Sequence, residues 1–196
     1  MLKISVMVSG GGTNFQAVID GIESGQIPDA KIVQVISSSP KAFALERAAK
    51  HGIPGTVVST ADFPDPDRKS DRILALLKEK ETDLIVLAGY MSVVDKKIID
   101  CYRGKIITIH PSLIPKYCGK GFFGKKVHAA VLAGGETVSG ATVHYVDEGI
   151  DTGAIISQEQ VPVLPGDTPD TLAERVLVTE HKILTEAVRK IASDEK

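Results

Sequence analysis

The residues best suited to chemistry lie between Ile106 and Pro115, in the order Ile-Ile-Thr-Ile-His-Pro-Ser-Leu-Ile-Pro. The isoleucines at 106, 107 and 109 are typical of a buried strand, and His110 follows at the strand end. Because Pro111 favours extended geometry in the residue before it, the imidazole is expected at a rigid corner between strand and loop. Open parallel sheets bind their ligands at this end of the strands. Taken alone, a His–Pro pair indicates a structural turn more often than a catalytic group.

A carboxylate partner for this histidine is available in the loop Asp147–Gly153, which reads Asp-Glu-Gly-Ile-Asp-Thr-Gly. If the strand before this loop opens on the same edge of the sheet as His110, Asp151 can reach the imidazole. A carboxylate beside a histidine orients the ring and favours its charged form, which is the usual arrangement for acid–base catalysis. Alternation along the strand places Thr108 on the same side as His110, so both side chains can address one ligand atom.

A glycine-rich turn follows the first predicted strand. Residues Leu2–Ser9 alternate and are rich in β-formers, Gly10–Asn14 reads Gly-Gly-Gly-Thr-Asn, and an apolar helical pattern begins at Phe15. Thr13 and Gln16 have the spacing of a capping box, which predicts that the helix begins there. A strand, a glycine turn and a helix start together present backbone N–H groups to an anion. A glycine turn without a ligand is the alternative.

The pattern around this turn restricts the kind of anion. Phe15 stands where a dinucleotide-binding fingerprint needs its third glycine, and the lysine of a Walker A motif is absent. The next predicted strand, Ile32–Ile36, is followed by serines rather than by an acid that could hold a ribose. These features argue against NAD and ATP and favour a phosphate monoester.

Further features each allow two interpretations. Glu180 falls on the apolar stripe of the last predicted helix, where a carboxylate needs either a hydrogen-bond partner or a polar ligand. The corner Gly89–Val94 is either ordinary core or the wall of a pocket for a flat ligand. Lys116–Lys126, with four lysines and three glycines, is a mobile loop that is either simply solvated or attracts an anionic ligand. His128, at the start of a predicted helix, is interpreted as structural.

The elements that must position these residues alternate between strands and helices. This alternation favours a doubly wound, mostly parallel α/β sheet of Rossmann-like type, built as a single domain over residues 1–196. The predicted strands are Leu2–Ser9, Ile32–Ile36, Thr56–Val58, Leu84–Ala88, the start of Ile106–Pro115, Ser139–Tyr145 and Ala154–Val163. The predicted helices begin near Phe15, span Ala42–His51, Arg68–Lys80, Lys96–Tyr102 and His128–Ala133, and close with one that starts at Thr168-Pro169.

Composition narrows the function classes. The chain has 196 residues, a net charge of -2 and 43% hydrophobic residues, which indicates a globular protein without an overall attraction to nucleic acid or anionic membranes. Two cysteines, Cys101 and Cys118, give neither a disulfide framework nor a CxxC metal site. The N-terminus does not read as a signal peptide, and no apolar run approaches the about 20 residues of a membrane span. A cytoplasmic protein without a metal is expected.

Taken together, Gly10–Asn14, Leu87–Val94, His110–Pro115 and Asp147–Gly153 resemble the phosphoribosylglycinamide formyltransferases, the folate-dependent transformylases of purine synthesis. The resemblance covers essentially the whole chain in order, and the combination is more specific than any one motif. It implies an enzyme that transfers a formyl group from 10-formyltetrahydrofolate to the primary amine of glycinamide ribonucleotide without a metal. The oligomeric state, monomer or homodimer, stays open.

The resemblance also implies roles for the site residues. The residues that would hold the ribonucleotide phosphate are Gly11, Gly12, Thr13 and Asn14, and Glu180 would contact its sugar and glycinamide part. The catalytic residues would be His110, Asp151 and Thr108. The folate site would be lined by Met91, Ser92, Val93, Val94, Asp147, Glu148, Gly149, Ile150 and Asp151.

The chain departs from this family at one position. Where the family's motif reads Asn-Ile-His-Pro-Ser-Leu, residues 108–113 read Thr-Ile-His-Pro-Ser-Leu. The family's asparagine donates a hydrogen bond to the formyl oxygen, whereas Thr108 offers one shorter hydroxyl donor. Since loss of one such donor costs about 10²–10³ in kcat, a folate- or phosphoribosyl-binding protein with weakened catalysis is an alternative. Formyltetrahydrofolate hydrolase and methionyl-tRNA formyltransferase are rivals that would each carry a second domain, for which this chain is expected to have no room.

Overall fold

The computed structural model describes residues 1–194, and all the predicted strands and helices are present with shifted ends. The strands are β1 (Leu2–Val8), β2 (Ala30–Ser37), β3 (Gly55–Val57), β4 (Leu84–Leu87), β5 (Ile106–His110), β6 (Val138–Tyr145) and β7 (Ile155–Pro162). The helices are α1 (Thr13–Glu23), α2 (Ala44–Lys50), α3 (Pro66–Glu79), α4 (Lys96–Cys101), α5 (Lys125–Ala133) and α6 (Pro169–Asp194).

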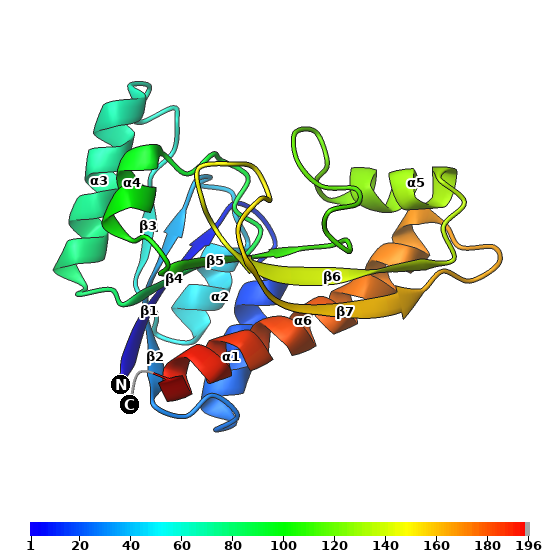
Figure 1. Cartoon of the computed structure of the whole chain (residues 1–196). Helices are drawn as coiled ribbons and strands as arrows, with labels where there is room; N and C mark the ends of the chain where they lie inside the picture. The colour runs from blue at the N-terminus through cyan, green and yellow to red at the C-terminus, as the bar shows by residue number, and fades with distance from the viewer. Residues whose placement is uncertain (195–196) are drawn as a thin grey trace.

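The strands form one seven-stranded sheet in the order β3-β2-β1-β4-β5-β6-β7 (Figure 1). The strands from β3 to β5 in this order pair in parallel, whereas β6 runs antiparallel to β5, and β7 to β6. The strand order reverses between β1 and β4, and such a switch point opens a crevice at the carboxyl ends of the strands. The prediction of a doubly wound, mostly parallel sheet is confirmed.

Helices cover both faces of the sheet, and each face has its own apolar core. Helices α1 and α6 pack on one face, through side chains such as Phe15 and Leu184. Helices α3 and α4 pack on the other face, through side chains such as Leu77 and Ile98. All four residues of β4 are buried, as expected for a parallel strand that is covered on both sides.

The start of α1 differs from the sequence prediction, because the capping box between Thr13 and Gln16 does not form. The N-cap is Gly12, with φ 72°, and no side chain caps the helix, so Thr13 already lies inside it. The Gln16 amide instead donates to Asp20 at 2.8 Å. A side chain at position 12 would be strained by this left-handed backbone, and its Cβ would lie 2.6 Å from that of Ala44. The glycine therefore fixes the turn between β1 and α1.

Helix α6 follows the predicted N-cap. The Thr168 hydroxyl accepts a hydrogen bond from the Thr171 amide at 3.2 Å, and Pro169 is the first helical residue. The helix buries its apolar stripe on the sheet, and Glu180 lies on that stripe with 8% of its surface exposed. None of the helices in residues 1–194 combines the length and the apolar character that a membrane span requires.

Two valines on α6 allow a matched test of this packing. Val176 is fully buried, whereas Val178 is 71% exposed. We expect Val176→Ala to lower the free energy of unfolding by about 1–3 kcal/mol, because it removes buried methyl groups and leaves a cavity. Val178→Ala has the same effect on helix propensity without the cavity, so its change should stay within about 0.5 kcal/mol. Urea unfolding measures both, and equal losses would contradict the packing.

Candidate active site

A cleft of about 510 Å³ opens at the carboxyl ends of β4 and β5. Its walls come from the segments that follow these strands, from the loop between β6 and β7, and from parts of α5 and α6. The residues Thr108, His110 and Asp151 all line it. A larger groove of about 760 Å³ runs between α1 and α6, but it contains none of these three. The cleft is therefore the candidate active site.

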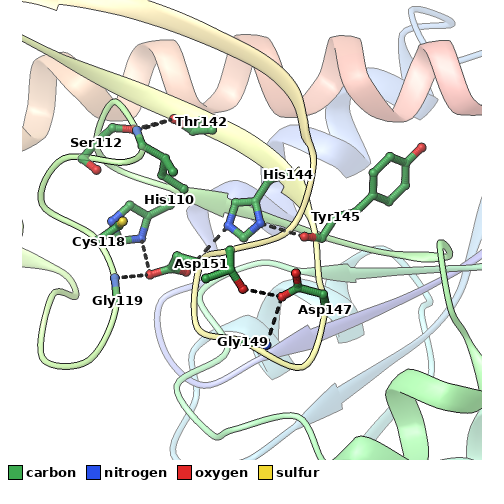
Figure 2. Close-up of polar contacts among 12 residues, drawn as sticks. His110, Ser112, Cys118, Gly119, Thr142, His144, Tyr145, Asp147, Gly149 and Asp151 are labelled. Carbon is green, nitrogen blue, oxygen red and sulfur yellow. Dashed lines mark hydrogen bonds and ion pairs between the residues drawn. The ribbon is translucent and has the colours of Figure 1, made fainter.

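At the centre of the cleft, Asp151 lies between two histidines (Figure 2). Its Oδ2 atom is 3.6 Å from Nδ1 of His110, and its Oδ1 atom is 3.6 Å from Nε2 of His144. Both histidines are almost completely buried. The structure thus brings together the two residues that the sequence predicted as a pair and adds a second imidazole to them.

The ring of His110 is oriented on both sides. It comes from the last residue of β5, and its Nε2 atom lies 3.0 Å from the carbonyl oxygen of Tyr117. Because a carbonyl can only accept, Nε2 must carry a proton, and Nδ1 is left to face Asp151. The Nε2 contact fixes the plane of the ring, while the 3.6 Å between Nδ1 and the Asp151 carboxylate exceeds a hydrogen bond, so Nδ1 is the ring atom still open to a ligand.

The loop holds the Asp151 carboxylate in place. Asp151 has a φ of 58°, a left-handed conformation that is uncommon for residues other than glycine. Its Oδ2 atom accepts a hydrogen bond of 2.9 Å from the Gly119 amide. Burial raises the pKa of this carboxyl, but the contact with His144, the Gly119 amide and the His110 ring together outweigh burial and lower it. Asp151 is therefore ionised near neutral pH.

His144 is a site residue that the sequence analysis missed. Antiparallel pairing of β5 with β6 sets it opposite Thr108, and its Nδ1 atom lies 2.8 Å from the Tyr145 carbonyl. A signal was present in the sequence, because β6 alternates apolar residues at 141 and 143, which join the core, with polar residues at 142 and 144. The antiparallel register, which brings the polar face to His110, could not be read from that pattern.

His128 was interpreted as structural, yet it lines the cleft from α5. It is 4% exposed, and no group in residues 1–194 pairs with its buried Nδ1 atom. Burial, together with the charge of His110, lowers the pKa of His128. The cleft therefore combines a neutral imidazole with the His110–Asp151 pair.

The carboxyl group of Glu180 reaches the cleft from α6 and has a protein partner. The side-chain amide of Asn14 donates to its Oε2 atom at 2.7 Å. Both interpretations of Glu180 thus apply, because it is hydrogen-bonded and also lines the cleft. Burial raises the pKa of Glu180, and the Asn14 bond opposes this only in part. The Oδ1 atom of Asn14 is buried without a partner among the described residues, so it is free to bind a ligand.

The four residues predicted to hold a phosphate face different ways. Asn14 lines the cleft and Thr13 lines the larger groove, whereas Gly11 and Gly12 line neither. Within residues 1–194, no protein group accepts a hydrogen bond from the amides of Gly11, Gly12 or Thr13. The loop thus keeps a set of free backbone donors beside the start of α1, as an anion site requires.

Both interpretations of the corner after β4 hold in part, because Tyr90 and Val94 pack against the core whereas Met91 and Val93 do not. Met91 is 57% exposed and Val93 is 85% exposed, and all four residues line the cleft. The Ser92 hydroxyl lies 3.5 Å from the ammonium group of Lys69. Apolar side chains left in contact with water at the rim of a cleft are suited to the face of a flat ligand.

The acidic loop folds back on β6 and forms the opposite wall. Asp147 accepts hydrogen bonds from the Gly149 amide at 3.0 Å and from the Thr152 hydroxyl at 2.6 Å. A Cβ at Gly153 would lie 1.8 Å from the Tyr145 carbonyl, so only glycine fits there. Glu148 lines the cleft and forms an ion pair of 2.9 Å with Lys96 of α4. Ile150 is half exposed and lines the cleft beside Gly149.

In the basic loop before α5, some lysines make contacts within the protein and other residues line the cleft. Lys116 pairs with Glu136, and Lys125 pairs with Asp170. Lys126 lies 4.6 Å from the centre of the Phe123 ring. Lys120, Phe122 and Phe123 line the cleft, so this loop also contributes to the site. In residues 1–194, no group of three or more His, Cys, Asp or Glu side chains is arranged to hold a metal ion.

Together, the fold and the cleft define an α/β protein with a ligand-sized cleft near the switch point of its sheet, beside a histidine–carboxylate centre. The family model described as Formyl transferase matches residues 2–188. The chain belongs to the formyl transferase family, and its relatives include proteins named phosphoribosylglycinamide formyltransferase.

The relatives support this membership over nearly the whole chain. A solved glycinamide ribonucleotide transformylase from Symbiobacterium toebii is 38% identical, with a TM-score of 0.93, over 99% of this chain and 89% of that one. The Arabidopsis thaliana chloroplastic phosphoribosylglycinamide formyltransferase is 37% identical over 98% of this chain. The Drosophila pseudoobscura trifunctional purine biosynthetic protein adenosine-3 is 45% identical over 97% of it. The chain spans 66% of the plant protein and 14% of the insect protein.

Glu180 provides a test of the site's electrostatics that needs no substrate. A carboxyl whose pKa is raised by folding stabilises the fold below its unfolded pKa, and this contribution is lost as pH rises through the folded pKa. Glu180→Gln keeps an oxygen acceptor for Asn14 but removes the buried charge. We therefore expect the variant to be more stable than the parent at pH 7, and the difference to vanish near pH 4. Urea unfolding across this range measures it.

Glu186→Gln is the control for the amide substitution, because Glu186 is an exposed residue of the same helix. It should shift stability by a similar small amount at both pH values. A Glu180→Gln variant that is less stable than the parent at pH 7 would contradict the burial argument.

Proposed function

We propose that this chain transfers a formyl group from 10-formyltetrahydrofolate to the primary amine of glycinamide ribonucleotide, a step of purine synthesis. The observation that carries the proposal is the meeting of His110, Asp151 and Thr108 in one cleft of a formyl transferase fold. The names of the plant and bacterial relatives agree with this activity. Because the chain spans only part of its curated relatives, the activity is proposed for this chain rather than transferred to it.

In this proposal the two ligands enter the cleft from opposite sides. The flat pteridine of the folate lies between the exposed apolar residues of Met91–Val94 and the loop from Asp147 to Asp151. The ribonucleotide phosphate binds the free amides of Gly11, Gly12 and Thr13 and the start of α1 at Asn14, whose side-chain Oδ1 atom can accept a hydrogen bond only from a donor such as a sugar hydroxyl. Glu180 then hydrogen-bonds the sugar hydroxyls. Exposed apolar surface, free amide donors and a buried carboxyl support these three assignments respectively.

The chemistry needs a nucleophile, an oxyanion partner and a route for one proton. The unprotonated amine attacks the formyl carbon, a C–N bond forms, and the carbonyl oxygen becomes an oxyanion. A protonated Nδ1 of His110, which is not hydrogen-bonded to Asp151 at 3.6 Å, and the Thr108 hydroxyl donate hydrogen bonds to that oxygen. The bond to the folate nitrogen then breaks, and the proton lost by the attacking amine passes to that nitrogen. Asp151 and an ordered water transfer this proton, and the reaction as written requires neither a metal nor an oxidant.

The geometry of β5 supports the oxyanion role of Thr108. Its isoleucine neighbours at 107 and 109 pack into the core, so Thr108 and His110 project to the other side of the strand. No hydrogen bond joins the Thr108 hydroxyl to another group in the described part of the chain. The hydroxyl is therefore free to turn towards a ligand oxygen.

We also propose that residues 1–196 form a single formyltransferase domain, active in the cytoplasm as a monomer or homodimer, without a nucleic-acid or membrane partner. The location stays a prediction, since one plant relative carries a chloroplastic name. The decisive experiment incubates the chain with glycinamide ribonucleotide and 10-formyltetrahydrofolate and identifies the products. Formylglycinamide ribonucleotide and tetrahydrofolate are expected. Free formate instead would indicate a hydrolase, and tight binding without turnover would indicate a binding protein.

The catalytic pair yields a prediction about non-additivity. His110→Ala and Asp151→Ala should each lower kcat by orders of magnitude, because Asp151 acts through the ring that it orients. The double variant should be little worse than the poorer single variant. Steady-state kinetics on the four proteins measures this. Strict additivity would contradict the pairing, and an unchanged rate in Asp151→Ala would remove Asp151 from the mechanism.

Thr108 yields a second prediction about catalysis. Thr108→Asn restores a carboxamide donor that reaches further than the hydroxyl, so kcat should rise by up to about 10²-fold. The Kd values for both ligands should change little, because the gain is confined to the transition state. Thr108→Val is the matched control, since it keeps the shape and removes the donor, and it should lower kcat. An asparagine variant that is no faster than the parent would show that the oxyanion is stabilised by other groups.

A further inference from the structure

We infer that Arg47, a residue of α2 outside the cleft, positions the phosphate-binding loop by holding the peptide between Gly11 and Gly12. This inference rests on the proposed function of that loop. Arg47 does not line the cleft, and the sequence analysis gave it no role. As a positioning residue, it acts on the ribonucleotide only through the loop.

Two hydrogen bonds from α2 fix the direction of the loop carbonyls. The Arg47 Nε atom donates to the Gly11 carbonyl at 2.8 Å, and the Ala44 amide donates to the Gly10 carbonyl at 3.1 Å. In a trans peptide, the C=O of one residue and the N–H of the next point in opposite directions. Holding the carbonyls of Gly10 and Gly11 towards α2 therefore turns the amides of Gly11 and Gly12 away from it, where no protein group in residues 1–194 accepts from them.

Contacts with neighbouring side chains hold Arg47 in the position that this role requires. Its Nη1 atom donates to the Gln16 side chain at 3.1 Å, which ties the loop to the first turn of α1. Its guanidinium lies 5.1 Å from the centre of the Phe43 ring. No carboxylate in the described residues pairs with it, so its side-chain hydrogen bonds go to the loop and to α1. A Cβ at position 12 would overlap Ala44, so only glycine lets α2 come close enough to make its two hydrogen bonds to the loop carbonyls.

A second observation indicates that this end of α1 meets a ligand. Asn14, the residue after Thr13, is 9% exposed, and its Oδ1 atom is buried without a protein partner within residues 1–194. Its amide group is held by Glu180, so the oxygen has a fixed direction in the cleft. Arg47 fixes the amides at one end of the loop and Glu180 fixes the side chain at the other. A planar guanidinium can make both of its contacts at once, whereas a lysine ammonium cannot reproduce that fork.

The experiment compares Arg47→Ala, Arg47→Lys and a control, Arg189→Ala, which removes an exposed arginine that lines the same groove as Arg47. In Arg47→Ala we expect KM for glycinamide ribonucleotide to rise about 10-fold to 100-fold, the range for hydrogen bonds from a charged group. The value of kcat and KM for 10-formyltetrahydrofolate should stay within about twofold. Arg47→Lys should lie between Arg47→Ala and the parent, and Arg189→Ala should match the parent.

A substrate that lacks the phosphate separates positioning from a merely structural effect. With glycinamide riboside, kcat/KM should be the same in the parent and in Arg47→Ala, because there is no phosphate for the loop to hold. An equal loss with both substrates, or no loss with the ribonucleotide, would overturn the inference. Arg47→Lys keeps the test decisive if the alanine variant does not fold.

Titration with ribose 5-phosphate, with ribose as its control, tests the inference without turnover. The parent should bind ribose 5-phosphate more tightly than ribose, and Arg47→Ala should abolish most of that difference. If the parent binds in this way but transfers no formyl group, the role of Arg47 stands and the proposed function fails. If the parent does not distinguish the two sugars, the role of Arg47 fails, whatever the outcome of the activity assay.

Discussion

The arrangement of the cleft depends on the Asp151 carboxylate, which joins three separate parts of the chain. It faces His110 at the end of β5, His144 at the end of β6 and the Gly119 amide of the basic loop. A buried carboxylate is stable only when nearby charges and donors replace water, and here their combined effect keeps its pKa low. The left-handed backbone at Asp151 and the close contact at Gly153 both bring the loop back over β6, so the fold accepts local strain to position one charge.

Two carboxyl groups of the cleft, the partly buried Asp151 and the buried Glu180, have pKa values shifted in opposite directions. Asp151 has several donors and remains charged, whereas Glu180 has one neutral amide donor, and burial raises its pKa. A single neutral hydrogen bond does not offset the loss of water around a carboxylate. Glu180 therefore reduces the stability of the free protein, as expected where a side chain awaits a polar ligand. Asn14, with its own oxygen unpartnered, belongs to the same poorly satisfied cluster.

The glycine loop follows a different principle, because its chemistry lies in the backbone. Its carbonyls are bound by α2 and its amides are left free, so the helix that supports the loop determines which way the donors point. The same strand order that opens the crevice between β1 and β4 brings this loop and the segment after β4 to one edge. Ser9 links the two directly, since its hydroxyl accepts a hydrogen bond from the Met91 amide at 2.7 Å. The proposed phosphate and folate sites are thus built on adjacent strands.

The sequence by itself determined the elements, the doubly wound sheet and the position of His110 at a strand end, because apolar periodicity and the His–Pro pair are local signals. It also identified Asp151 as a carboxylate that could reach His110, and Glu180 as a carboxyl group on an apolar stripe that needs a partner. Only the tertiary structure decided the partners: His144 and His128 enter the cleft through strand register and helix packing, which join residues far apart in the chain. The Gly12 N-cap of α1 and the exposure of Met91 and Val93 were likewise decided by packing. Local patterns specify what a segment can form, whereas the burial and direction of each side chain depend on neighbours that the local sequence does not contain.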